Sequence, residues 1–154
     1  MVTGIDLAVD QRGQLWSSAV DYDAPAHPAV TEHPLGRGPD LAVAIAVAAD
    51  PTDDVREFLE AHTLPIDRLL VLRPAAGAKD NAVPTAAAAN ALAVGIRDTV
   101  RRASKGSPVI HLFLAGPMGL AMLLGHRWNR VRPTVVYEDT RGPQAYEAEF
   151  RVDA

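Results

Sequence analysis

Runs of apolar residues recur along the last three quarters of the chain, and segments with helical spacing separate them. The apolar runs cover residues 41–47, 69–72, 109–114 and 133–138. Such nearly unbroken runs are typical of parallel strands that are covered on both faces. The segments between them are 50–62, 85–103 and 118–128, in which apolar residues recur every three or four positions. From residue 40 onward the pattern predicts the order β-α-β-α-β-α-β.

This alternation predicts an α/β fold with a mostly parallel, Rossmann-like sheet flanked by helices on both faces. Residues 144–152 could add an edge strand to that core, which spans residues 40–152. Ahead of the core, apolar and polar residues alternate over 3–9, a turn follows at 10–13, and residues 14–20 could return as a second strand, which predicts an accessory β-hairpin within residues 1–20. The whole chain, 1–154, is expected to be one domain.

Residues 21–39 separate the hairpin from the core and carry four prolines and two glycines. Proline and glycine in this density favour an irregular connection, so we expect a linker here.

Ligands of open α/β sheets bind beyond the carboxyl ends of the strands, often at the positive end of a following helix. Gly116 and Pro117 stand at such a place, because a strand precedes them and a helix follows. Asp50 is the expected N-cap of the first helix, with Pro51 at its first turn. The candidate ligand-binding residues are Ala49, Asp50, Pro74, Ala76, Gly77, Lys79, Gly116, Pro117, Met118, Tyr137 and Glu138.

Simpler explanations exist for several of these residues. Lys79 could be a solvated loop lysine, and Gly116 with Pro117 could only shape a tight turn. His111 lies inside an apolar run, where a hydrogen-bonded core histidine is expected. Gly119 and Gly125 interrupt the third helix, and each costs about 1 kcal/mol relative to alanine, which suggests a close backbone approach to a ligand or to the sheet.

Composition narrows the range of functions. The 154 residues are 48% hydrophobic and carry a net charge of −4, so general affinity for duplex DNA or RNA is not expected. Cysteine is absent, which excludes disulfides and thiolate metal sites. No signal peptide or membrane-spanning run is found, so a cytoplasmic protein is expected.

The common motifs of nucleotide and catalytic sites are also missing. The sequence has no G-x-G-x-x-G after a strand, no Walker A loop and no G-x-S-x-G elbow. The five histidines show no metal-ligand spacing. We therefore predict no metal, no cofactor and no catalytic residues.

Several segments in order resemble the SAVED domain. They are His111–Pro117, Leu124–Asn129 and Tyr137–Glu138, with Asp40–Ala44, Asp54–Val55, Leu69–Gly77 and Ala93 together with Ile96–Asp98 upstream. The likeness covers about residues 40–152. Because it rests on several motifs in register, we regard it as specific.

The resemblance implies a sensor of cyclic oligonucleotide second messengers in bacterial anti-phage defence, of the CBASS or CRISPR type. SAVED domains are similar to two fused CARF-like Rossmann units, and ligand binding typically drives oligomerisation and activates an effector. The family's binding positions correspond here to Pro74–Lys79, Gly116–Met118 and Tyr137–Glu138. This chain has room for one such unit, so a second SAVED/CARF-like unit or an effector chain is an expected partner.

We therefore expect a binding module without catalysis, in which backbone N–H groups at Gly116–Met118 and Gly77 meet phosphates and Lys79 neutralises them. One alternative is a small hydrolase or nuclease that degrades a cyclic nucleotide, with His126 or Glu138 as its base. Another is a structural oligomerisation subunit that uses Arg127–Arg132 as a contact surface.

Overall fold

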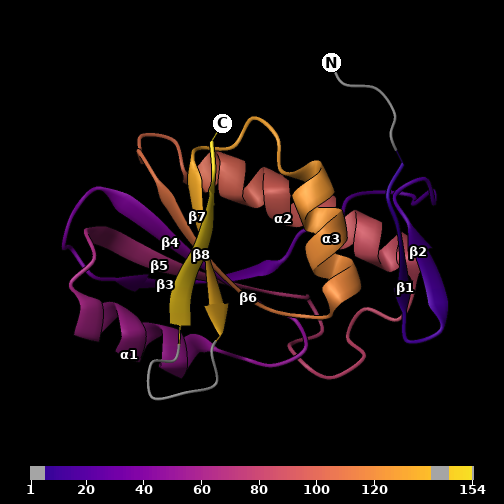
Figure 1. Ribbon diagram of the computed structural model, residues 1–154, viewed down its shortest axis with the longest axis horizontal. Helices are drawn as coiled ribbons and strands as arrows, with labels where there is room; N and C mark the ends of the chain where they lie inside the picture. The colour runs from indigo at the N-terminus through magenta and orange to yellow at the C-terminus, as the bar shows by residue number, and fades with distance from the viewer. Residues whose placement is uncertain (1–5, 140–145, 154) are drawn as a thin grey trace.

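A six-stranded mixed sheet forms the centre of the molecule (Figure 1). The computed structural model describes residues 6–139 and 146–153. The strand order is β3-β5-β4-β6-β7-β8; the four inner strands are parallel, and β3 and β8 pair antiparallel at the two edges. The strands are β3 Ala29–Pro34, β4 Asp40–Ala46, β5 Ile66–Arg73, β6 Ile110–Ala115, β7 Thr134–Asp139 and β8 Tyr146–Val152.

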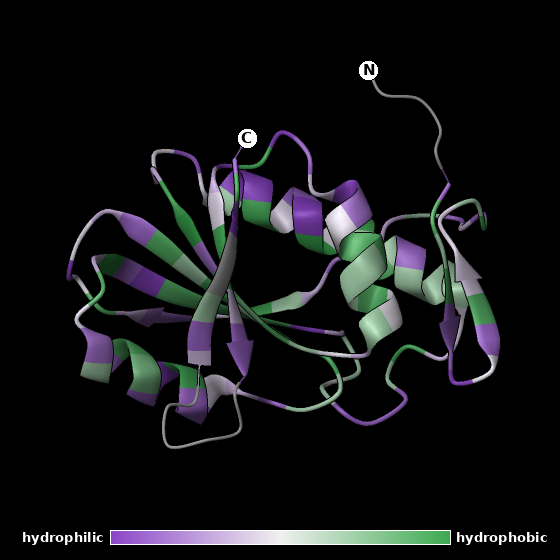
Figure 2. Ribbon diagram, in the orientation of Figure 1, coloured by the Kyte–Doolittle hydropathy of each residue, from purple (hydrophilic) through white to green (hydrophobic). Residues whose placement is uncertain are grey.

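Helices cover both faces of this sheet, as the predicted Rossmann-like class requires. The helices are α1 Thr52–His62, α2 Ala86–Ala103 and α3 Met118–Arg127. Strand β4 is buried along its whole length, and its side chains alternate between two cores. Leu41, Val43 and Ile45 face α2 and α3, whereas the alanines between them face α1. Figure 2 shows the hydrophobic residues gathered on the inner strands and on α3.

Local capping explains where two of the helices begin. The Thr85 hydroxyl accepts the Ala88 N–H at 3.1 Å and starts α2. At α1 the expected N-cap, Asp50, lies one residue too early, because Pro51 occupies that position. The Asp50 carboxylate still accepts the Thr52 N–H at 3.0 Å, so it satisfies a donor of the first turn from outside the helix.

The predicted hairpin is present, with shorter strands than expected: β1 Ala8–Gln11 and β2 Gln14–Ser17. Arg12 and Gly13 form its turn, with φ of 50° and 82°. Positive φ at both positions is typical of the two-residue turns whose twist matches a hairpin. The hairpin packs beside α2 and α3 (Figure 1), and Trp16 belongs to the main core.

The prediction of a linker over residues 21–39 is wrong for much of that segment. Residues 29–34 form strand β3, which pairs with β5 at the sheet edge. Before it, the Ala26 N–H donates to the Ala91 carbonyl at 2.9 Å, and a Cβ on Gly95 would lie 1.9 Å from the Ala26 oxygen. The chain thus presses directly on α2 at a glycine. The strand escaped detection because most of its side chains are exposed and show no apolar alternation.

Strand β8 confirms the expected edge strand, although residues 144 and 145 lie outside the described part of the chain. None of the helices in the described ranges is long and apolar enough to cross a bilayer. Over the same ranges, no group of three or more His, Asp or Glu side chains is arranged to hold a metal ion.

Candidate ligand-binding cleft

The path of the chain through the sheet leaves a crevice at the carboxyl ends of β4 and β6. After β4 the chain passes through α1 to β5 on one side, and after β5 it returns through α2 to β6 on the other side. Such a reversal of strand order is the usual ligand position in open α/β sheets. The two strand ends are tied together, because the Val47 and Ala48 N–H groups both donate to the Ala115 carbonyl, at 2.9 and 3.0 Å.

A cavity of about 340 Å³ opens at this place. Its volume lies within the usual range of small-ligand pockets. Four parts of the chain line it: the hairpin, the turn after β4, the loop between β5 and α2, and the turn after β6. The lining residues are Gln11, Arg12, Gln14, Trp16, Val47, Ala48, Lys79–Pro84 and Gly116–Met118. We call this cavity the switch-point cleft.

The hairpin is fixed to the start of α3 by a side chain that caps the helix. Pro117 is the N-cap of α3 and provides no side-chain hydrogen bond. Instead, the Gln11 side-chain oxygen accepts the Gly119 N–H at 2.7 Å. A Cβ on Gly119 would lie 2.6 Å from the Trp16 ring and 2.9 Å from that oxygen. The expected close approach at Gly119 is therefore real, but the partner is the hairpin rather than a ligand or the sheet.

Gly125 has no such neighbour, because a Cβ built there would meet nothing within 4 Å outside its own helix. The expectation of a close approach to the sheet is therefore wrong at Gly125, and approach to a ligand stays a prediction there. The structure gives no packing reason for this glycine.

Backbone hydrogen bonds hold the loop after β5 in place. The Gly77 N–H donates to the Pro74 carbonyl at 2.8 Å, and the Lys79 N–H donates to the Val47 carbonyl at 2.9 Å. The expected use of the Gly77 N–H as a phosphate donor conflicts with this turn. The exposed Lys79 side chain is part of the cleft lining. The loop is thus a support that fixes Lys79 at the end of β4.

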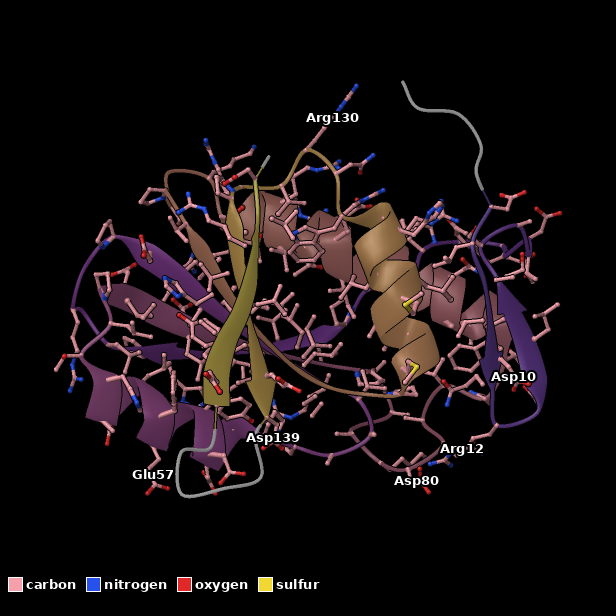
Figure 3. All side chains as sticks on the ribbon, in the orientation of Figure 1. Asp10, Arg12, Glu57, Asp80, Arg130 and Asp139 are labelled. Atoms are coloured by element: carbon pink, nitrogen blue, oxygen red, sulfur yellow. The ribbon has the colours of Figure 1, made fainter. Side chains whose placement is uncertain are left out.

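Two cations and one carboxylate set the charge of the switch-point cleft. Arg12 at the hairpin turn forms an ion pair with Asp80 at 3.3 Å, and the two side chains are 72% and 75% exposed. Figure 3 shows this pair joining the hairpin turn to the loop after β5. Together with Lys79, the charged lining residues sum to one positive charge, although the whole chain carries −4. The cleft therefore has the opposite sign to the molecule as a whole.

The structure brings four of the predicted site residues together in the switch-point cleft: Lys79, Gly116, Pro117 and Met118. Five others lie at the same edge of the sheet but do not line the cleft: Ala49, Asp50, Pro74, Ala76 and Gly77. Pro74 among them is buried.

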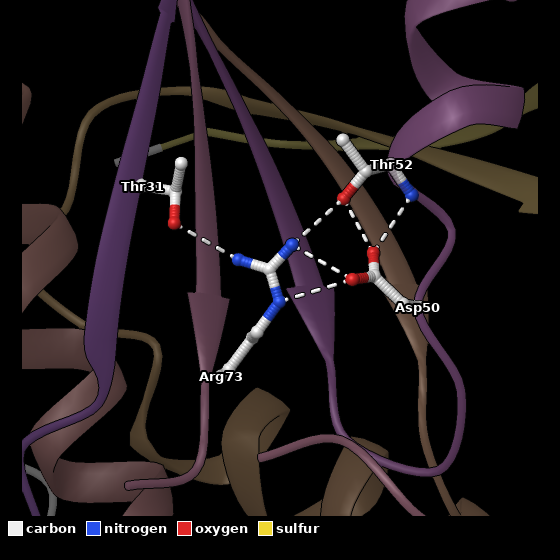
Figure 4. A network of polar contacts seen from close by, with 4 residues as sticks. All are labelled: Thr31, Asp50, Thr52 and Arg73. Atoms are coloured by element: carbon white, nitrogen blue, oxygen red, sulfur yellow. Dashed lines mark hydrogen bonds and ion pairs between the residues drawn. The ribbon is translucent and has the colours of Figure 1, made fainter.

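Asp50 belongs to a polar network at the carboxyl end of β5 (Figure 4). Its carboxylate accepts two hydrogen bonds from the Arg73 guanidinium, at 2.7 and 3.0 Å, and is also bonded to the Thr52 hydroxyl. Arg73 donates further to the Thr31 hydroxyl at 3.0 Å, which ties in strand β3. Burial raises the pKa of Asp50, but the hydrogen bonds from Thr52 and Arg73 outweigh burial and lower it. Asp50 is therefore an anionic structural anchor.

Tyr137 lies in the core on the α1 side. Its hydroxyl is 2.7 Å from His111 Nδ1, and His111 Nε2 is 2.8 Å from an Asp40 carboxylate oxygen. The ring stacks on Phe113 with centroids 4.5 Å apart. Burial, and then the charge of Asp40, raises the pKa of Tyr137. The expectation that His111 is a hydrogen-bonded core residue is confirmed, and the Tyr137 hydroxyl is committed to it.

Glu138 borders a second cavity, of about 360 Å³, between α3 and β7. Apolar side chains dominate its lining, including Leu112, Leu114 and Leu124. Its charged residues are Glu138 and Asp139, which would repel a phosphate. This cavity is therefore a poor place for an anionic ligand.

Sequence reasoning missed the contribution of the hairpin to the cleft: Gln11, Arg12, Gln14 and Trp16. The sequence indicated a hairpin but not where it packs. Gly119 was the available signal, because a glycine in the first turn of a helix indicates close contact with another segment. That contact partner lies more than a hundred residues earlier, which no local pattern shows.

The SAVED family, described as the SMODS-associated and fused to various effectors sensor domain, matches residues 1–152 of this chain. CD-NTase-associated protein 4 of Enterobacter hormaechei subsp. hoffmannii (strain UCI 50) is 27% identical over 143 residues, which are 88% of this chain and 28% of that protein.

Solved structures share the fold. The Acinetobacter baumannii Cap4 SAVED/CARF-domain containing receptor with the cyclic trinucleotide 2′3′3′-cAAA aligns over 97% of this chain and 32% of its own, with a TM-score of 0.72 and 21% identity. The Moraxella osloensis Cap4 receptor covers 96% of this chain and 30% of its own, with a TM-score of 0.62 and 18% identity. The chain thus spans less than a third of each of these relatives.

The family match extends beyond the 40–152 likeness of the sequence motifs and includes the hairpin and strand β3. These N-terminal elements are therefore part of the family's fold. Because the match spans nearly the whole sequence, the chain belongs to the SAVED family of sensor domains.

Proposed function

We propose that this chain is a sensor module that binds a cyclic oligonucleotide second messenger at the switch-point cleft. One observation supports this proposal above all. The lining of the crevice is positively charged, although the chain as a whole is acidic. A cyclic oligonucleotide is a compact polyanion, so it suits a cleft with Arg12 and Lys79 in its walls. The Acinetobacter baumannii relative was solved with the cyclic trinucleotides 2′3′3′-cAAA and 3′3′3′-cAAA.

The turn after β6 would supply the second attraction for phosphate. Gly116 and Met118 border the cleft at the N-terminus of α3, where the helix dipole is positive. Met118 is 71% exposed, so a ligand can approach this end of the helix. Lys79 approaches from the loop after β5. We infer that phosphates lie between these two elements.

The ligand would extend beyond this chain. The cleft volume of about 340 Å³ is at the low end for drug-sized ligands, and the chain spans under a third of its relatives. We propose that a second SAVED/CARF-like unit, or an effector chain, completes the site. Ligand binding would then hold two units together and promote oligomerisation, which activates the effector in antiviral defence. Light scattering with and without the nucleotide checks this step, and assembly independent of ligand would favour a structural subunit instead.

We infer that the module acts by binding and has no catalysis of its own. The candidate bases for a hydrolase, His126 and Glu138, are both exposed, and neither is among the residues that line the switch-point cleft. A base must lie within hydrogen-bond reach of the reacting group. The arrangement therefore favours a sensor over a nuclease.

Replacement of Lys79 by methionine tests the position of the ligand. Lys79→Met removes one cleft cation while keeping the length of the side chain, and we expect the dissociation constant of the cyclic nucleotide to rise about tenfold. Lys105→Met is the matched control, because Lys105 is an exposed residue in the turn after α2 and is not among the cleft-lining residues. If calorimetry gives the same affinity for the two variants, the ligand does not bind in the switch-point cleft.

A further inference from the structure

The hairpin turn and the loop after β5 meet through one exposed ion pair, Arg12–Asp80, at the mouth of the switch-point cleft (Figure 3). Arg12 comes from the turn between β1 and β2, and Asp80 follows Lys79. The two segments are nearly seventy residues apart in the sequence. The pair therefore bridges two walls of one cleft.

The backbone on both sides of the pair is fixed. The Gly13 N–H donates to an Asp10 carboxylate oxygen at 2.8 Å, which stabilises the turn that carries Arg12. On the other side, the Lys79 N–H donates to Val47 and the Ala82 N–H donates to the Lys79 carbonyl, at 2.9 and 3.1 Å. Asp80 is thus held between two anchored residues. Only the two side chains need to rotate for the pair to open.

The pair itself is weak. Both side chains are more than two thirds exposed, and the contact is one nitrogen to one oxygen at 3.3 Å. Exposed pairs of this kind contribute little to stability, because water and salt screen them. A guanidinium in the same place can donate two parallel hydrogen bonds to the two free oxygens of a phosphodiester, whereas it makes a single contact with Asp80 here.

We propose that Arg12 is a ligand-binding residue and that Asp80 is its partner only in the ligand-free state. This inference rests on the proposed sensor function. When the phosphodiester enters the cleft, Arg12 moves from the Asp80 carboxylate to the phosphate, and Asp80 turns to solvent. Asp80 competes with the ligand for Arg12. The Asp80 carboxylate therefore lowers the affinity of the cleft for the ligand.

The proposal predicts opposite effects of the two halves of one ion pair. Arg12→Ala weakens binding about fivefold, the size expected for loss of one exposed charged contact, and Asp80→Asn tightens it about threefold. The double variant binds as weakly as Arg12→Ala, because no arginine remains to be released. The probe is the tightest-binding member of a panel of cyclic di-, tri- and tetranucleotides, measured by isothermal titration calorimetry on the full chain.

Matched controls separate this effect from net charge. Arg56→Ala and Glu57→Gln make the same charge changes on exposed positions of α1, on the other face of the sheet from the hairpin. Melting temperatures of all variants show whether the fold is kept. Two results would contradict the exchange of Arg12 between Asp80 and the phosphate while leaving the sensor function intact. One is an affinity of Asp80→Asn that is lower than that of the unaltered chain or equal to that of Glu57→Gln. The other is an affinity of Arg12→Ala equal to that of Arg56→Ala. If the unaltered chain binds no member of the panel, either alone or with its partner unit present, the sensor function itself is overturned and the exchange with it.

Discussion

At the scale of single residues, the charged groups at the carboxyl edge of the sheet divide into charges held in a hydrogen-bond network and charges exposed to water. Asp50 and Arg73 neutralise each other, and the Arg73 side chain is only 23% exposed. Arg12 and Lys79, in contrast, stand in water at the cleft. Only the second group is available to a ligand. Charge at a strand end is therefore a poor guide to a site until its partner is known.

The Asp50 anchor makes a prediction about acid stability. The pKa of Asp50 lies below its ordinary value of 3.8, so its stabilising contribution is present at neutral pH and is lost as the pH falls through the lowered pKa. Arg73→Met removes two of the hydrogen bonds that lower this pKa. We expect the Asp50 pKa to rise in that variant, and acid unfolding to begin at a higher pH.

Carbon-detected NMR of the Asp50 carboxyl and acid titration of the circular dichroism measure the two effects. Arg56→Met is the control, because Arg56 is exposed on α1 and removes the same charge. An unchanged Asp50 pKa in Arg73→Met would show that the network in Figure 4 does not control this carboxyl.

Some of the candidate residues lie in the cleft and others lie outside it, for a physical reason. Lys79, Gly116, Pro117 and Met118 were found because strand ends and a helix start place them in the cleft. Tyr137 lies outside the cleft, and the sequence could not show this, because alternation along a strand does not say which face holds the ligand. Its side chain points to the α1 face, where the His111 ring nitrogen lies 2.7 Å from its hydroxyl.

At the scale of elements, the hairpin is the part whose role changed most. The sequence predicted an accessory hairpin. In the structure, its Gln11 side chain caps α3, and Arg12 and Trp16 line the cleft. The inner strands were predictable because burial on both faces forces unbroken apolar runs. Strand β3 was not predictable, because the side chains of an exposed edge strand need not be apolar. Its existence depends on pairing with β5.

The two glycines of α3 test the packing of the hairpin. Gly119→Ala places a Cβ 2.6 Å from the Trp16 ring, so we expect a loss of about 1–3 kcal/mol in the free energy of unfolding as the hairpin shifts. Gly125→Ala meets nothing within 4 Å, so the higher helix propensity of alanine should stabilise the chain by up to about 1 kcal/mol. Urea titration of both variants measures their free energies of unfolding. Equal changes in the two variants would show that the hairpin does not pack against Gly119.

At the scale of the whole molecule, the family, the topology and the charge distribution agree. The chain belongs to the SAVED family, its strand order opens a crevice between β4 and β6, and the cations of that crevice oppose the net charge of −4. The central claim is that the crevice binds a cyclic oligonucleotide.

Isothermal titration calorimetry of the unaltered chain against cyclic di-, tri- and tetranucleotides tests that claim most directly. We expect saturable heat with at least one member of the panel, and a dissociation constant that rises with salt because phosphate contacts are electrostatic. The same nucleotide should bind Lys79→Met about tenfold more weakly. Absence of heat with every cyclic nucleotide in the panel, both for the chain alone and with its partner unit present, would contradict binding at the cleft.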